Sequence, residues 1–187
     1  MRHFLFTVFC VFVSSVSLFG AAPKYPPTRV DFDALKFELV PQKQLPKSVF
    51  FWINQCTEGN QDPEFAGRVA RLDLNGDGVK ELIVESECKR ENQYGLWQER
   101  KGRWLCLLSV WGQPVFLKKS NGYYRVEVEW DLRHSDKSVR ELYTFKGERY
   151  HATRIDEYRG DTFLRTKSTK EREEVLQWDF KEFSKLP

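Results

Sequence analysis

The chain has 187 residues, of which 41% are hydrophobic and 30% charged, and its formal net charge is +3. This composition suits one globular domain and excludes a collagen-like, a low-complexity or a multi-span membrane protein. The near balance of 30 basic against 27 acidic residues gives no electrostatic basis for binding nucleic acid.

Residues 1–22 have the layout of a secretory signal peptide, with a basic start at Arg2 and an apolar run over residues 4–19. Cleavage after Ala22 or after Ser17 places small residues at the cut. The alternative is an uncleaved membrane anchor, but the run is shorter than the roughly 20 residues that a spanning helix needs. We therefore expect an exported protein, periplasmic or extracellular, with no membrane span after processing.

Residues 23–46 contain five of the eight prolines and predict an extended lead-in. The following segment, 47–56, places Val49, Trp52 and Ile53 at helical spacing, which predicts a short amphipathic helix. We expect this helix to open a single β-rich domain that covers residues 47–187.

From residue 68 onward, short segments of alternating polarity are separated by turn dipeptides such as Asn121-Gly122, which is typical of hairpins. The expected strands cover residues 68–74, 79–88, 95–100, 103–111, 115–119, 124–132, 139–145 and 149–155. About eight strands at this spacing predict a mainly β (α+β) fold, an antiparallel meander in one or two sheets.

The tail admits two interpretations. A helix that begins after Ser168 would place Leu176, Phe180 and Phe183 on one face, whereas a strand would align Leu176, Trp178 and Phe180. A Ser-x-x-Glu capping pattern at Ser168 favours a C-terminal helix.

Residues 73–81 carry the one motif with defined chemistry. Oxygen-bearing side chains at alternate positions can converge on a hard cation, and Gly78 permits the sharp turn that brings the later ligands round. The candidate calcium ligands are Asp73, Asn75, Asp77 and Glu81 by their side chains and Val79 by its carbonyl. An EF-hand would need an acidic residue at position 12, where Val84 stands, and the segment after the loop is strand-like.

The run Arg71–Val84 resembles the loop of FG-GAP and VCBS-type repeats, found in integrin-like β-propellers and in exported bacterial proteins. The resemblance implies that the five ligands of this chain hold calcium between two strands, with Glu81 where the family more often has Asp. A propeller needs about four blades or more of four strands, so one loop copy and eight strands predict one or two small sheets instead. The alternative to a calcium site is a metal-free hairpin turn.

Cys56, Cys88 and Cys106 allow one disulfide with three possible pairings in an oxidising compartment. We expect Cys88 to pair with Cys106, because both lie in the strands after the loop, while Cys56 lies on the inner face of the expected helix. Three buried thiols in a reducing compartment are the alternative.

No serine-hydrolase, metalloprotease or phosphate-loop motif occurs in the sequence. We therefore expect an exported, calcium-binding and non-catalytic β-rich module that binds an unknown protein or glycan or has a structural role in the cell envelope. The alternative function is a small secreted glycan-directed hydrolase or a hydrolase inhibitor. A hydrolase of this kind requires a pocket with two facing carboxylates.

Overall fold

The computed structural model of the protein describes residues 29–30, 33, 35–56, 66–88, 91–132 and 135–185. The expected signal peptide, residues 1–22, lies outside the described residues. Within the described part, neither helix is long and apolar enough to cross a membrane.

The fold is mainly β and entirely antiparallel, as expected, but the described residues form eleven strands in two sheets rather than about eight. The five-stranded sheet has the order β2 (Glu38–Pro41), β3 (Ala66–Leu72), β4 (Glu81–Cys88), β5 (Glu91–Arg100) and β6 (Arg103–Trp111). The six-stranded sheet has the order β1 (Arg29–Val30), β7 (Pro114–Ser120), β8 (Tyr123–Asp131), β9 (Lys137–Lys146), β10 (Arg149–Arg159) and β11 (Thr162–Lys167). Each sheet is thus a meander, with β1 added beside β7.

Three strands were not anticipated because their sequences lack apolar alternation. Strands β1 and β2 are only two and four residues long and lie in the proline-rich segment 23–46. Strand β11 is almost wholly exposed, so it contributes little apolar surface to the core. Edge strands of this kind form because a neighbouring strand offers unpaired backbone groups, which no local pattern reveals.

The hairpin turns follow directly from the sequence. Asn121 and Gly122 have φ angles of 55° and 82°, and Lys101 and Gly102 have φ angles of 53° and 74°. Paired positive φ values match the right-handed twist of the strands that they join.

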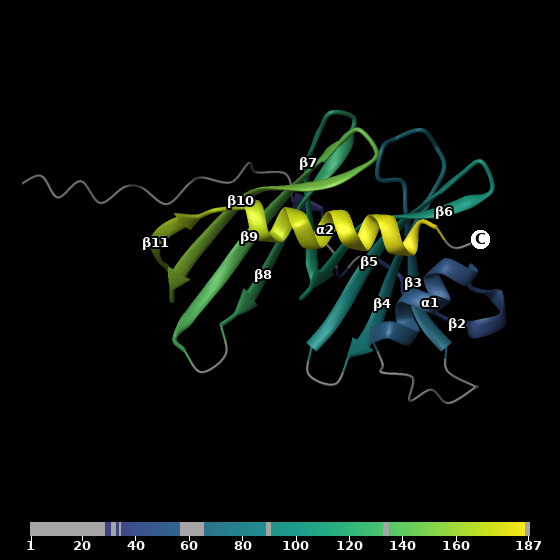
Figure 1. The fold of residues 1–187 in the computed structure, drawn as a ribbon, viewed down its shortest axis with the longest axis horizontal. Helices are drawn as coiled ribbons and strands as arrows, with labels where there is room; N and C mark the ends of the chain where they lie inside the picture. Colours follow the sequence, from purple (N-terminus) through teal and green to yellow (C-terminus); the bar gives the residue numbers. More distant parts are fainter. Residues whose placement is uncertain are drawn as a thin grey trace, which may run out of the picture.

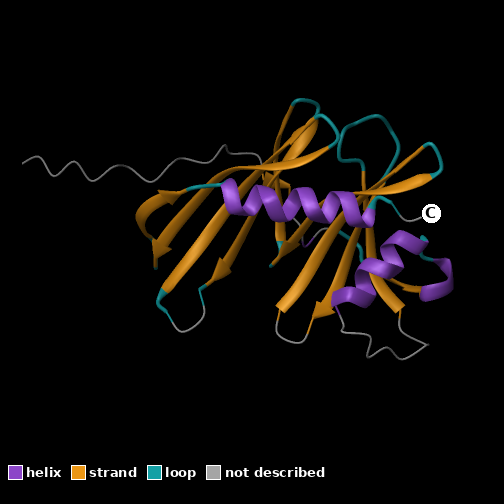
Figure 2. Ribbon diagram, viewed as in Figure 1, coloured by secondary structure: helices purple, strands orange, loops and turns teal. Residues whose placement is uncertain are grey.

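Two helices complete the fold. Helix α1 (Lys47–Cys56) covers the segment predicted to be helical, although it follows β1 and β2 rather than opening the fold, and a short 3-10 turn (Gln42–Gln44) precedes it. Helix α2 (Lys170–Phe183) covers the ambiguous tail. Figures 1 and 2 show α2 running across both sheets, and it contacts β6 in one sheet and β10 in the other.

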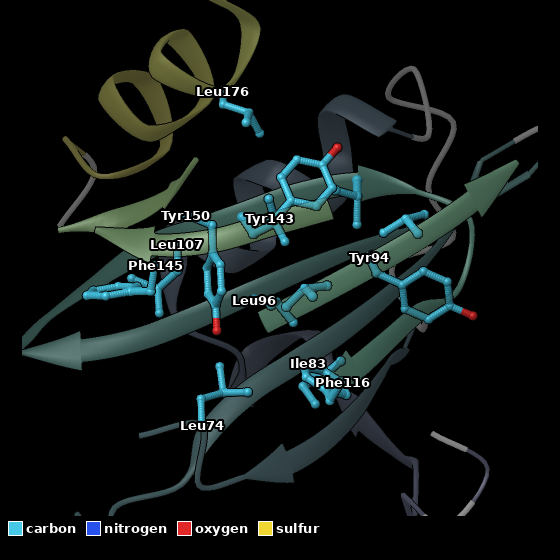
Figure 3. Close-up of a cluster of buried hydrophobic side chains, with 14 of the residues drawn as sticks. Leu74, Ile83, Tyr94, Leu96, Leu107, Phe116, Tyr143, Phe145, Tyr150 and Leu176 are labelled. Atoms are coloured by element: carbon cyan, nitrogen blue, oxygen red, sulfur yellow. The ribbon is translucent and has the colours of Figure 1, made fainter. Parts of the chain in front are cut away.

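The main core combines side chains of both sheets and α2. Ile83 and Leu96 come from the five-stranded sheet, Phe116 and Tyr143 from the six-stranded sheet, and Leu176 from α2. Figure 3 shows Leu176 reaching from the helix toward the other side chains of this cluster. The helix therefore closes the core where the two sheets meet.

A second core lies on the other face of the five-stranded sheet. Trp52 and Ile53 of α1 are completely buried there against Trp97 of β5 and Phe183 of α2. Burial of each large apolar side chain stabilises the fold by about 1.5–3 kcal/mol. The five-stranded sheet is thus covered on both faces, which explains why residues 81–86 of β4 are all buried.

Candidate functional site

Residues 73–80 connect β3 to β4, and the ladder between these strands ends at the pair Leu72 and Glu81. Gly76 and Gly78 have φ angles of 88° and 85°. Glycine adopts this region without the steric cost that a Cβ would impose. The loop predicted from the sequence therefore lies between two strands, as expected.

The polar side chains of the loop fold back onto its own backbone. The carboxylate of Asp73 accepts hydrogen bonds from the amides of Gly76 (2.5 Å) and Gly78 (3.0 Å). The Asn75 side-chain oxygen accepts from the Asp77 amide (2.9 Å), and Asp77 accepts from the Val79 amide (2.7 Å). These bonds fix three oxygen-bearing side chains at the surface in one conformation.

The loop also carries an unusual charge environment around Asp73. Partial burial raises the pKa of this carboxyl, but hydrogen bonds from Gly76 and Gly78 and the ammonium of Lys119 lower it more, so that its pKa lies below the ordinary value. Lys119 lies so close that its amine would be 2.7 Å from a Cβ added at Gly76. Asp73 is therefore held as a carboxylate.

The structure does not place Glu81 with the other expected ligands. Its side chain is only 1% exposed. One carboxylate oxygen accepts from the Leu74 amide and the other from the side-chain amide of Gln98, each at 2.7 Å. Burial raises the pKa of Glu81, although these two donors lower it in part.

The oxygen-bearing residues of the loop are candidate ligands for calcium. Asp73, Asn75 and Asp77 offer hard oxygens at the surface, and a carboxylate oxygen that accepts one amide keeps a further lone pair for a cation. Val79 is exposed beside them. Among the described residues, however, no group of three or more His, Cys, Asp or Glu side chains is arranged to hold a metal ion. Asp73, Asn75 and Asp77 thus offer the donor type that calcium prefers, whereas both carboxylate oxygens of Glu81 are hydrogen-bonded in the interior.

The loop is attached to the six-stranded sheet as well as to its own. The amide of Tyr124 donates to the Leu74 carbonyl at 3.0 Å. The hydroxyl of Tyr123 lies 3.3 Å from the Asn75 side-chain nitrogen and 3.1 Å from that of Gln98. No sequence pattern marks Tyr123 or Gln98 as part of the site, because Tyr123 lies 48 residues from Asn75 and 25 residues from Gln98 in the chain. The loop therefore joins the two sheets.

The register does not bring Cys88 and Cys106 together. Cys88 is opposite Glu91 and Cys106 is opposite Trp97, on the two sides of β5. Six residues along a strand span about 20 Å, whereas a disulfide needs Cα atoms within about 7 Å. Cys106 is buried at 2% exposure in the second core.

Two cavities contain pairs of carboxylates, the feature required by the alternative function. One, of about 250 Å³, is lined by Asp33 and Glu85. Both oxygens of Glu85 are already engaged, one by Asn92 and Tyr94 (2.5 and 3.0 Å) and the other by Arg68 (2.6 Å).

The other cavity, of about 260 Å³, is lined by Glu141 and Glu171. Glu141 accepts a hydrogen bond from Tyr143 and lies 3.5 Å from Arg172. In both cavities the buried carboxylate is thus committed to neighbouring side chains within the fold. No specific observation assigns either pair the acid and base roles of a glycosidase.

Comparison of the chain with protein-family models, with curated proteins and with solved structures found no match.

Proposed function

We propose that this protein is an exported, non-catalytic β-rich module that binds calcium at the loop 73–81 and either binds a protein or glycan partner or has a structural role in the cell envelope. The observation that carries the proposal is the fixed arrangement of Asp73, Asn75 and Asp77 at the loop surface. The likeness of the loop to FG-GAP and VCBS-type repeats supports it.

The four surface residues would hold the ion, and calcium would supply a charge that offsets the repulsion between Asp73 and Asp77. Asx-type hydrogen bonds to backbone amides keep both carboxylates in place, which lowers the entropy cost of binding. Water molecules would complete the six to eight oxygens that calcium requires. A site with few protein ligands is expected to bind weakly, at about 0.1–1 mM.

Calcium binding would stabilise the fold rather than take part in a chemical reaction. Leu74 and Asn75 connect the loop to β8 through Tyr124 and Tyr123. A cation that fixes the loop would therefore also fix the junction of the two sheets. Binding to the native state alone raises the free energy of unfolding by about 2.7 kcal/mol at a hundredfold excess over the dissociation constant.

The experiment is thermal unfolding of the purified protein in millimolar calcium and in chelator. We expect calcium to raise the midpoint of the wild type, Asp77→Ala to abolish the increase, and Asn75→Ala to reduce it less, because a neutral ligand is lost. Asp161→Ala is the matched control, an exposed aspartate beside Gly160 in the turn after β10. Equal midpoints with and without calcium in the wild type would show that the loop is only a turn.

A further inference from the structure

A cavity of about 490 Å³ lies where three parts of the chain meet, far from the loop in sequence. The β5–β6 hairpin supplies one wall, the turn between β9 and β10 another, and the C-terminal end of α2 the third. Its volume lies in the range of sites that bind small molecules. It is larger than the two cavities that contain carboxylate pairs.

The lining of this cavity is strongly basic. Five cationic side chains line it, against the single carboxylate of Glu148; they are Arg100, Lys101, Arg103, Lys181 and Lys185. Over the whole chain, by contrast, 30 basic residues are nearly balanced by 27 acidic ones. Leu105 and Phe180 add an apolar surface.

The two arginines are held in place by hydrogen bonds that leave most of their donors available. Arg100 donates through Nε to the side-chain oxygen of Gln98 at 2.5 Å. Arg103 donates through one terminal nitrogen to the Ser184 carbonyl at 2.5 Å. A guanidinium has five N–H donors in a rigid fork that matches phosphate, so each side chain is positioned and still able to bind a ligand.

Stabilisation of the α2 C-terminus explains only part of this cluster. Basic side chains near a helix C-terminus stabilise its last carbonyls, and Arg103 does so. Arg100 is instead oriented by Gln98 of its own strand. Within the described part of the chain, the amines of Lys101 and Lys181 have no ion-pair partner, whereas Lys185 pairs with Glu182 at 2.8 Å.

We propose that this cavity binds a phosphate-bearing anion, carried either by a small molecule or by a lipid headgroup. The two arginine forks and the amines of Lys101 and Lys181 exceed what the single lining carboxylate of Glu148 would neutralise, and a phosphate anion matches them. The apolar surface of Leu105 and Phe180 would accommodate the part of the ligand that carries the phosphate. None of the residues that line the cavity belongs to the loop 73–81, although Gln98, which orients Arg100, also donates a hydrogen bond to Glu81.

Calorimetric titration of the purified protein with inorganic pyrophosphate tests the free anion. Co-sedimentation with phosphatidylglycerol vesicles, compared with pure phosphatidylcholine vesicles, tests the lipid source. The variant Lys101→Gln/Lys181→Gln removes two charges from the cavity. The matched control Lys118→Gln/Lys170→Gln removes two exposed charges elsewhere, one of them at the other end of α2.

We expect at least one of the two phosphate probes to bind, and the cavity variant to weaken that binding by about tenfold or more, because charge-assisted contacts are lost. The control should bind as the wild type does. Binding of pyrophosphate would identify a small-molecule ligand, and binding of the anionic vesicles alone a headgroup; either supports the proposal. Failure of both probes, or equal weakening in both double variants, would overturn it.

Discussion

The backbone amide of Leu74 donates a buried hydrogen bond of 2.7 Å to a carboxylate oxygen of Glu81. This bond connects the beginning of the loop 73–81 to its last residue. The other oxygen of Glu81 accepts from Gln98. A residue that the loop pattern identifies as a metal ligand thus serves as an internal acceptor, and the surface oxygens remain for a cation.

Substitutions of Glu81 distinguish a role as internal hydrogen-bond acceptor from a role as metal ligand. Glu81→Ala leaves the Leu74 amide and the Gln98 side chain without their acceptor, so we expect a loss of about 1–3 kcal/mol in the free energy of unfolding. Glu81→Gln retains an acceptor and should cost less. Urea unfolding measures both. If Glu81→Gln also abolished the calcium-dependent increase in the thermal midpoint, Glu81 would be a ligand rather than an internal acceptor.

Tyr123→Phe tests the connection between the two sheets. The ring of Tyr123 stacks on Phe145 with 3.6 Å between centroids, and Phe preserves this contact. Only the hydroxyl bonds to Asn75 and Gln98 are lost, so we expect about 1 kcal/mol of destabilisation in chemical unfolding. Tyr124→Phe is the control on the neighbouring residue. Equal effects of the two variants would contradict the assigned role.

Glu173 attaches α2 to the six-stranded sheet. Its carboxylate accepts from the Ala152 amide and pairs with Arg149 (3.2 Å) and His151 (2.8 Å). Glu173→Ala should therefore cost about 2 kcal/mol, since charge-assisted hydrogen bonds are lost. Glu174→Ala, an exposed neighbour on the same helix, should change stability by less than about 0.5 kcal/mol. Equal losses in the two variants, measured by urea unfolding, would show that the contacts of Glu173 with the sheet do not stabilise the fold.

We expect Asp179 to make the stability of the protein depend on pH. Burial raises its pKa from 3.8 to about 6, although Arg172 lowers it in part. The folded state then binds more protons than the unfolded state between these values, so stability from this group falls as the pH rises from about 4 to 6. The increase in the pKa of Asp179 corresponds to a change of at most about 3 kcal/mol in the free energy of unfolding. Because Asp179 is only partly buried, we expect a change of about 1 kcal/mol.

The measurement is urea unfolding of the wild type and Asp179→Asn at pH 4 and pH 7. The variant should gain stability relative to the wild type as the pH rises, because it avoids the cost of a buried charge. A difference between the two proteins that is the same at both pH values would refute this assignment.

The sequence by itself determined the elements whose cause is local. The spacing of Val49, Trp52 and Ile53 specified α1, and the dipeptides at Lys101 and Asn121 specified hairpin turns through their positive φ angles. Alternation along β8 predicted a half-buried strand. These signals depend on backbone conformation and on one apolar face, which neighbouring residues encode.

Only the tertiary structure decided the features that depend on distant partners. Strand β11 pairs with β10 although its own sequence is nearly all exposed. The inward position of Glu81 depends on Gln98, and the basic cavity forms only because α2 ends beside the β5–β6 hairpin. Each of these three features follows from contacts between residues far apart in the sequence, which satisfy a buried polar group or cover a sheet. Such contacts produce no periodic pattern in the sequence.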